Sequence, residues 1–169
     1  MLIGVESTDS ARLCLAPVLQ YVRSYPPVIL DLRRDLKTLV FRALDRHVFA
    51  YDLMQPTTEP PTTFMRLYHT HLPWYIDVVP SGGSYVTLRD LFAAICHTLA
   101  FRICSADYYN DELDDEDREA LRLAWDERCR DESERVDGVK RVDFLRGKYM
   151  FQGLTRGKSG MWQLRTGRE

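Results

Sequence analysis

The stretch TLRDLFAAICHTLAFRI, residues 87–103, carries the strongest helix signal in the chain. Thr87 can cap the start of the helix, and Asp90 follows three residues later, which is the spacing of a capping box. Apolar side chains then recur at helical intervals along one stripe, which is formed by Leu88, Leu91, Phe92, Ile95, Leu99 and Ile103. A helix with one such stripe buries it, so we expect this segment to be the central helix of the core.

Strand-like segments precede this helix. The runs VILDL (28–32), FMRLYH (64–69) and WYIDVVP (74–80) are rich in β-branched and aromatic residues, and THLP joins the last two into a predicted hairpin. Within 74–80, alternation places Trp74, Ile76 and Val78 on one face and Asp77 on the other. A further short strand is expected near residues 48–51. The Pro- and Thr-rich segment 54–64 is predicted to be an extended loop.

The C-terminal part reads as three more strands, KRVDFL (140–145), KYMFQGL (148–154) and MWQLRT (161–166). A two-residue turn at Arg146-Gly147 would pair the first two as a hairpin. In that register the core face is formed by Val142, Phe144, Tyr149 and Phe151. The other face then carries a narrow polar stripe of Arg141, Asp143 and Gln152, with Asp143 placed to pair with Arg141.

An acidic helix is predicted over residues 114–131, with Leu121, Trp125 and Cys129 on one stripe and acidic residues in its first turn. Strands, then two helices, then strands form an α+β pattern. We therefore predict a single compact α+β domain over residues 28–169, preceded by an N-terminal arm, residues 1–27. The expected architecture is a mainly antiparallel sheet packed against two helices, with the acidic helix alongside the core helix.

The bulk composition restricts the possible partners. The 169 residues carry a net charge of −2, but residues 110–137 hold 13 acidic and 5 basic side chains (−8) and residues 138–169 hold 2 and 8 (+6). No stretch approaches the roughly 18 apolar residues of a membrane span, so no membrane partner is predicted. Four scattered cysteines without a CxxC pair favour reduced thiols and an intracellular location, in the cytoplasm or nucleus.

Seven segments in order carry a family resemblance: VILDLRRD, TTEPP, PWYIDV, VTLRDLF, KRVDFL, FQGL and the later Trp162. Together they resemble domain-of-unknown-function family number 6699, which occurs widely in mushroom-forming fungi, mainly basidiomycetes. The resemblance covers roughly residues 28–164. It implies a compact domain of an intracellular fungal protein, and it brings no activity, cofactor or catalytic residue.

Metal and nucleophile chemistry find little support in the sequence. His69 and His71 share one face of a strand, but zinc requires about four ligands, and no further ligand pair is present at a typical spacing. Cys96 lies beside the apolar stripe of its helix and reads as a small buried side chain. We predict no catalytic residue, no metal and no cofactor.

The remaining hypothesis is a binding function. The candidate ligand-binding residues are Arg66, His69, His71, Asp77, Arg141 and Asp143. The preferred function is a non-catalytic intracellular binding or protein-interaction module, whose partner is another protein or a second copy of the chain in a homodimer.

Two alternatives stay open. One is a small enzyme with a dispersed polar cleft between the Pro-rich loop and the sheet. The other is a nucleic-acid-binding protein that uses its basic C-terminal segment. The second is not favoured, because the predicted hairpin points its aromatic rings toward the core and its charges away from it, whereas stacking needs both on one face.

Overall fold

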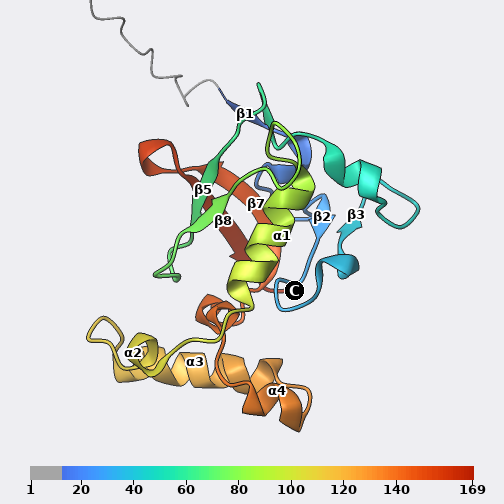
Figure 1. The fold of residues 1–169 in the computed structure, drawn as a ribbon. Helices are drawn as coiled ribbons and strands as arrows, with labels where there is room; N and C mark the ends of the chain where they lie inside the picture. Colours follow the sequence, from blue (N-terminus) through green and yellow to red (C-terminus); the bar gives the residue numbers. More distant parts are fainter. Residues whose placement is uncertain (1–12) are drawn as a thin grey trace, which may run out of the picture.

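The computed structural model describes residues 13–169, and a four-stranded sheet with the order β6-β5-β8-β7 lies at its centre (Figure 1). The strands are β5 (Met65–Tyr68), β6 (Ile76–Val78), β7 (Met150–Arg156) and β8 (Trp162–Gly167). The β5–β6 and β7–β8 pairs are antiparallel, and the central β5–β8 pair is parallel. The sheet is therefore mainly antiparallel, as predicted, and it joins two segments that are far apart in the sequence.

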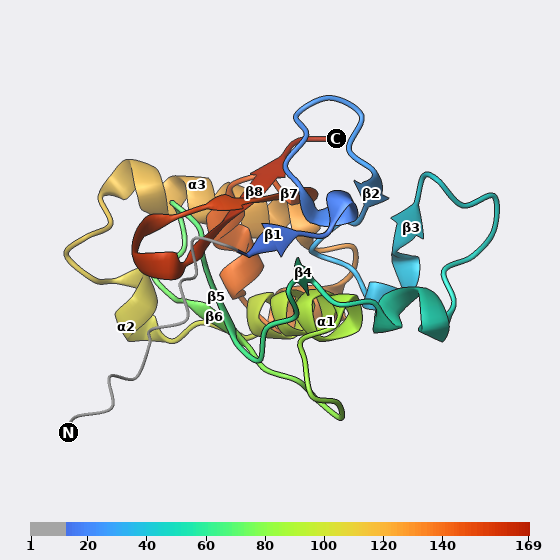
Figure 2. The same cartoon turned by 90° about the horizontal axis from the view of Figure 1, so that it is seen from above.

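Helix α1 (Leu88–Leu99) packs across one face of this sheet (Figures 1 and 2). The predicted capping box is present, because the Thr87 side chain accepts a hydrogen bond from the Asp90 N–H and Asp90 accepts one from the Thr87 N–H. Phe92 of α1 meets Phe151 of β7 edge to face. The predicted stripe is buried from Leu88 to Leu99, which confirms the central helix.

Two short sheets and several turns complete this body. β1 (Cys14–Leu15) pairs with β4 (Thr58–Glu59), and β2 (Val28–Ile29) pairs with β3 (Val40–Phe41). The chain also makes four one-turn helices here: η2 (Pro17–Leu19), η3 (Leu36–Thr38), η4 (Ala50–Met54) and η6 (Lys158–Gly160).

The described part of the predicted N-terminal arm lies on the domain. The N–H groups of Tyr21 and Val22 donate to carbonyls of β7, and the Leu19 side chain is fully buried. The Leu32 N–H donates to the Tyr149 carbonyl just before β7. Residues 13–32 thus flank the outer side of β7, while residues 1–12 of the arm lie outside the described residues.

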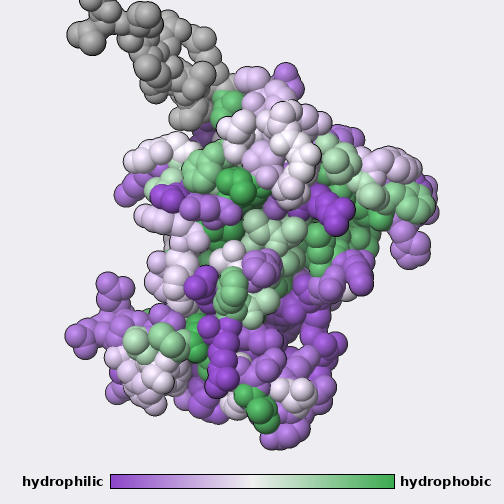
Figure 3. Space-filling model, in the orientation of Figure 1, coloured by the Kyte–Doolittle hydropathy of each residue, from purple (hydrophilic) through white to green (hydrophobic). Residues whose placement is uncertain are grey.

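A second layer of helices runs below the sheet: α2 (Ser105–Tyr108), α3 (Asp115–Arg128) and α4 (Glu132–Val136). Figure 1 shows α3 crossing beneath the lower end of α1, and it packs on the short helix η5 (Arg141–Leu145). The acidic helix is therefore confirmed, but its predicted place alongside the core helix is wrong. The surface of this layer is mostly hydrophilic (Figure 3).

Two predicted strands are helical turns instead. Segment 141–145 forms η5, so the predicted hairpin and its register are wrong, and β7 pairs with β8. The Asp143 side chain accepts the Lys140 N–H at 2.8 Å, and this local bond favours a turn over an extended strand. Residues 50–54 form η4 in place of the strand expected near 48–51, with Asp52 accepting the Phe49 N–H in the same way.

Candidate binding surfaces

Arg66 and Asp77 form a two-pronged ion pair across β5 and β6. The Arg66 Nε and Nη2 atoms donate to the two Asp77 oxygens at 2.7 and 2.8 Å. These hydrogen bonds lower the pKa of Asp77 below its usual value, against the smaller opposing effect of burial. The side chains are 42% and 47% exposed, so the pair lies at the surface.

Exposed apolar side chains surround this ion pair. Phe64 is 48% exposed, Tyr75 is 56% exposed and Val79 is 59% exposed. The Arg66 guanidinium lies 5.0 Å from the Tyr75 ring centre and 5.8 Å from that of Phe64. Because side chains alternate along a strand, these groups lie on the side of the sheet opposite α1. We call them the outer β5–β6 face: Phe64, Arg66, Tyr75, Asp77 and Val79.

This outer side continues onto the neighbouring strands. Met65 and Leu67 are buried under α1, whereas Arg66 and Tyr68 alternate with them and are half-buried. Tyr68 is the register partner of Gln163 on β8. The surface is therefore amphipathic across at least three strands.

His69 follows β5 and is 7% exposed. Its Nδ1 atom accepts the His71 N–H at 3.1 Å, so the proton of a neutral ring lies on Nε2, which then donates to Thr166 Oγ1 at 3.0 Å. Burial lowers the pKa of His69 to about 4, and the charges of His71, Lys148 and Arg165 act in the same direction. Both ring nitrogens are thus used within the protein, and the ring is held neutral.

His71 does not complete a metal site with His69. The two rings are tilted at a centroid distance of 5.7 Å. Across residues 13–169, no group of three or more His, Cys, Asp or Glu side chains is arranged to hold a metal ion.

Asp143 belongs to a buried clasp between α3 and η5. Arg128 donates to its two oxygens at 2.7 and 3.0 Å, and the same guanidinium donates to the Gly138 carbonyl at 2.9 Å. Burial alone lowers the pKa of Arg128, but the hydrogen bonds and charge of Asp143 outweigh it and raise that pKa. The predicted pairing of Asp143 with Arg141 is wrong, because the partner comes from the acidic helix.

Arg141 lies instead over two aromatic rings, 4.5 Å from the Trp74 centre and 5.1 Å from the Phe101 centre. The six candidate residues therefore occupy three separate places: a surface ion pair, a buried histidine turn, and the surroundings of η5. None of the six lines either of the two hollows described next.

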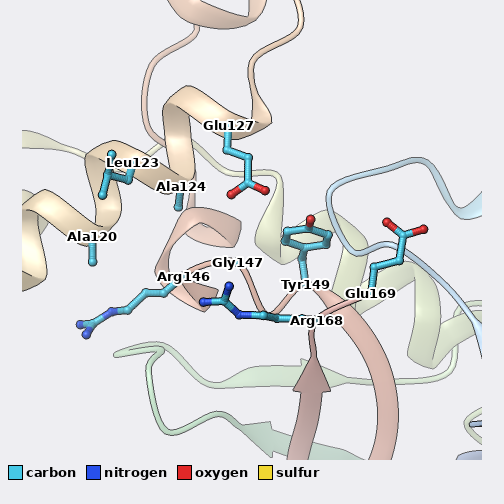
Figure 4. Close-up of a pocket in the computed structure, with 9 residues that line it drawn as sticks. All are labelled: Ala120, Leu123, Ala124, Glu127, Arg146, Gly147, Tyr149, Arg168 and Glu169. Atoms are coloured by element: carbon cyan, nitrogen blue, oxygen red, sulfur yellow. The ribbon is translucent and has the colours of Figure 1, made fainter. Parts of the chain in front are cut away.

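The larger hollow is an open groove of about 450 Å³ between α3 and the turn before β7 (Figure 4). Ala120, Leu123, Ala124 and Glu127 form its helical wall, and Arg146, Gly147, Tyr149, Arg168 and Glu169 line the rest. Arg146 is already paired with Asp117 at 2.8 Å. The groove carries both signs of charge, so it favours no single ligand charge.

The smaller hollow, of about 90 Å³, lies where residues 32–34, α1 and η5 meet. We call it the arginine pocket. Its walls are Leu32, Arg33, Arg34, Cys96, Leu99, Ala100, Arg128, Glu134, Lys140 and Val142. Four of these side chains are cationic and one is anionic. This pocket was not predicted from the sequence. The adjacent arginines Arg33 and Arg34 are the sequence feature that could have indicated a cationic site.

The chain matches the model of a Family of unknown function (DUF6699) over residues 28–160. The chain belongs to this family. No curated protein and no solved structure gives a significant match. In this DUF6699 domain, the segments VILDLRRD and KRVDFL, two of those that carry the resemblance, meet around the arginine pocket.

The cysteines of the DUF6699 domain are all free thiols. Burial raises the pKa of Cys96 to about 11, with smaller contributions from Asp35 and Asp31, so its reactive thiolate is strongly disfavoured. Among residues 13–169, no helix has the length and apolar character that crossing a membrane requires.

Proposed function

We propose that this DUF6699 domain is a non-catalytic protein-interaction module that works inside the fungal cell, with the outer β5–β6 face as its contact surface. The observation that carries the proposal is the arrangement of three exposed apolar side chains around an ordered arginine–aspartate pair. It lies on the sheet face opposite the core helix.

The composition of this face is that of a protein-binding surface. Tyr, Phe and Arg are enriched in the centre of protein interfaces, and burial of aromatic rings supplies much of the binding energy. Asp77 and the two rings already hold Arg66 in one geometry. Binding of a partner would therefore cost this surface less side-chain entropy, because Arg66 is already ordered.

A protein partner fits this face better than nucleic acid. Asp77 takes the Nε and Nη2 donors of Arg66, so a phosphate cannot form a two-pronged pair with that edge of the guanidinium. The half-exposed Asp77 carboxylate also repels phosphate. The enzyme alternative finds less support, because the six polar candidates lie in three places and both His69 ring nitrogens are already bonded.

Two observations support an intracellular location. All four cysteines are unpaired, which is the state that a reducing compartment maintains. The family membership adds the fungal setting through the distribution stated above for this family.

The test is site-specific photo-crosslinking in fungal cells that express the full chain. A benzophenone amino acid replaces Tyr75 in one variant and Tyr109, which is 73% exposed at the end of α2, in a matched control. We expect a discrete protein adduct from position 75 that position 109 does not give and that a Val79→Asp substitution abolishes.

An adduct of twice the chain mass would identify a second copy as the partner. The proposal fails if position 75 gives no adduct or the same adducts as position 109. It also fails if nuclease, and not protease, removes the adduct.

A further inference from the structure

We propose that the arginine pocket binds a phosphate-sized oxyanion. This site is separate from the outer β5–β6 face and does not depend on the proposed function. Its walls bring together Arg33, Arg34, Arg128 and Lys140, which lie far apart in the sequence, around a hollow of about 90 Å³.

Most of the charges at this pocket are balanced by partners. Arg33 pairs with Asp31 at 2.8 Å, and Lys140 lies 3.3 Å from Asp137. Arg128 is paired with Asp143 as described above.

The pocket's own carboxylate, Glu134, is also balanced. It is bound by the backbone N–H and then the guanidinium of Arg130, which lower its pKa to about 2. It therefore stays ionised and engaged with Arg130.

Arg34 has no carboxylate to itself, because Glu134, whose pKa the Arg34 charge also helps to lower, is bonded to Arg130. The carboxylate oxygen nearest to Arg34, on Asp31, is 3.8 Å away and already bonded to Arg33. The Arg34 side chain is 25% exposed, so it can move toward a bound anion.

Arg128 supplies a preordered donor at the wall of the pocket. Its hydrogen bonds use Nε and Nη2 only, and its Nη1 atom has no partner among residues 13–169. The side chain is 5% exposed and fixed by Asp143. An anion in the pocket would meet a guanidinium that does not have to be ordered first.

The size and walls of the pocket fit a small oxyanion. The hollow of about 90 Å³ is several times the roughly 10–15 Å³ that one water needs on the same measure, so it has room for a small anion. Leu32, Leu99, Ala100 and Val142 form apolar walls. A lower local dielectric at such walls strengthens the attraction between an anion and the surrounding cations.

The test titrates inorganic phosphate into the full chain at constant ionic strength and follows backbone amide shifts by NMR. We expect saturable shifts at residues 32–34 and 140–142. Arg34→Ala and Lys140→Ala are each expected to weaken binding about tenfold. Arg122→Ala, on the exposed side of α3 and outside the pocket, is the matched control and should bind as wild type.

One further titration identifies the source of the anion. A short phosphoserine peptide that binds more tightly than inorganic phosphate would indicate a modified protein, and the reverse order would indicate a free anion. The proposal is overturned if phosphate gives no saturable shifts, or if Arg34→Ala and Lys140→Ala bind it as wild type does.

Discussion

Two arginine–aspartate pairs in this domain have nearly the same geometry and opposite surroundings. Arg66 grips Asp77 at 2.7 and 2.8 Å, and Arg128 grips Asp143 at 2.7 and 3.0 Å. The first pair is almost half exposed, whereas the second is 5% and 1% exposed. The chemistry is the same, so the difference between the pairs comes from burial.

Burial changes what each pair can do. Water and salt weaken the surface pair, whose ordered guanidinium remains accessible to a partner. The buried pair has lost its hydration, so each charge depends on the other. Under the proposed function, the exposed pair contributes to recognition on the β5–β6 face, whereas the buried pair holds α3 against η5.

Asp143→Ala should have the largest effect on stability, because it leaves the Arg128 charge buried without its partner. We expect the free energy of unfolding to fall by about 3–5 kcal/mol, measured by urea denaturation. A double variant, Arg128→Met with Asp143→Leu, should recover part of this loss, since no buried charge remains but the Gly138 carbonyl and the Lys140 N–H still lose their partners. A loss under about 1 kcal/mol in Asp143→Ala would contradict the structural role of this pair.

His69 shows the other way to bury an ionisable group, which is to keep it neutral. Its folded-state pKa is about 4 and the ordinary value is 6.5. Between these values the unfolded chain binds a proton that the folded chain does not, so stability is complete above pH 6.5 and falls as the pH is lowered toward 4. The loss over this window should reach about 3 kcal/mol.

Urea denaturation between pH 7 and pH 5 covers more than half of that window and lies above the range in which most carboxylates titrate. His69→Gln should make the profile shallower and leave the contribution of His71, whose pKa is also lowered by burial. The matched control is His47→Gln, at an exposed position. An equally steep profile in His69→Gln would contradict the buried neutral ring.

A substitution in the turn that follows η5 tests the effect of backbone strain in this region without removing a charge. Gly147 has φ +82°, a conformation that β-branched residues rarely adopt. Gly147→Val should lower the free energy of unfolding by about 1 kcal/mol or more, measured by denaturation, while the Arg128–Asp143 pair stays intact. Unchanged melting would show that this turn tolerates a side chain and does not constrain η5.

Asp77→Ala should have the smallest effect on stability. Removal of an exposed ion pair changes the free energy of unfolding by less than about 1 kcal/mol, and high salt should abolish the difference from wild type. The same variant should lower the yield of the Tyr75 photo-adduct, because Arg66 loses its fixed geometry. A large loss of stability in Asp77→Ala that salt does not change would contradict the view that the Arg66–Asp77 pair, unlike the buried Arg128–Asp143 pair, contributes little to stability.

The parts of the fold that the sequence predicted are those with redundant local signals. Segment 87–103 combined a capping box with a stripe of six apolar residues; the capping box and the first five residues of the stripe were found, while Ile103 lies beyond the end of α1. Ile76 and Val78 were placed correctly on the core face because strict alternation admits one register. The parallel pairing of β5 with β8 could not be predicted, since the sequence of a strand does not specify which other strand lies beside it.

The wrong strand predictions fell on short segments of about five residues, whose pattern fits a strand and a helical turn equally well. In segment 141–145, Val142, Phe144 and Leu145 are buried in η5, as they could also be in a strand. Asp143 decided the outcome through its bond to the Lys140 N–H and its pair with Arg128. Arg128 lies seven residues after the buried Leu121 and so on the inner stripe of α3, which was the available signal for a buried partner.

The pairing of β5 with β8 has a consequence for how the chain is made. Leu67 cannot meet Trp162 until the ribosome has released the C-terminal strands. At about 5–20 residues per second, the β5–β6 hairpin waits on the order of ten seconds with the backbone edge of β5 unpaired. A nascent chain stalled before Met150 would therefore be a natural target for chaperones, whatever the finished domain binds.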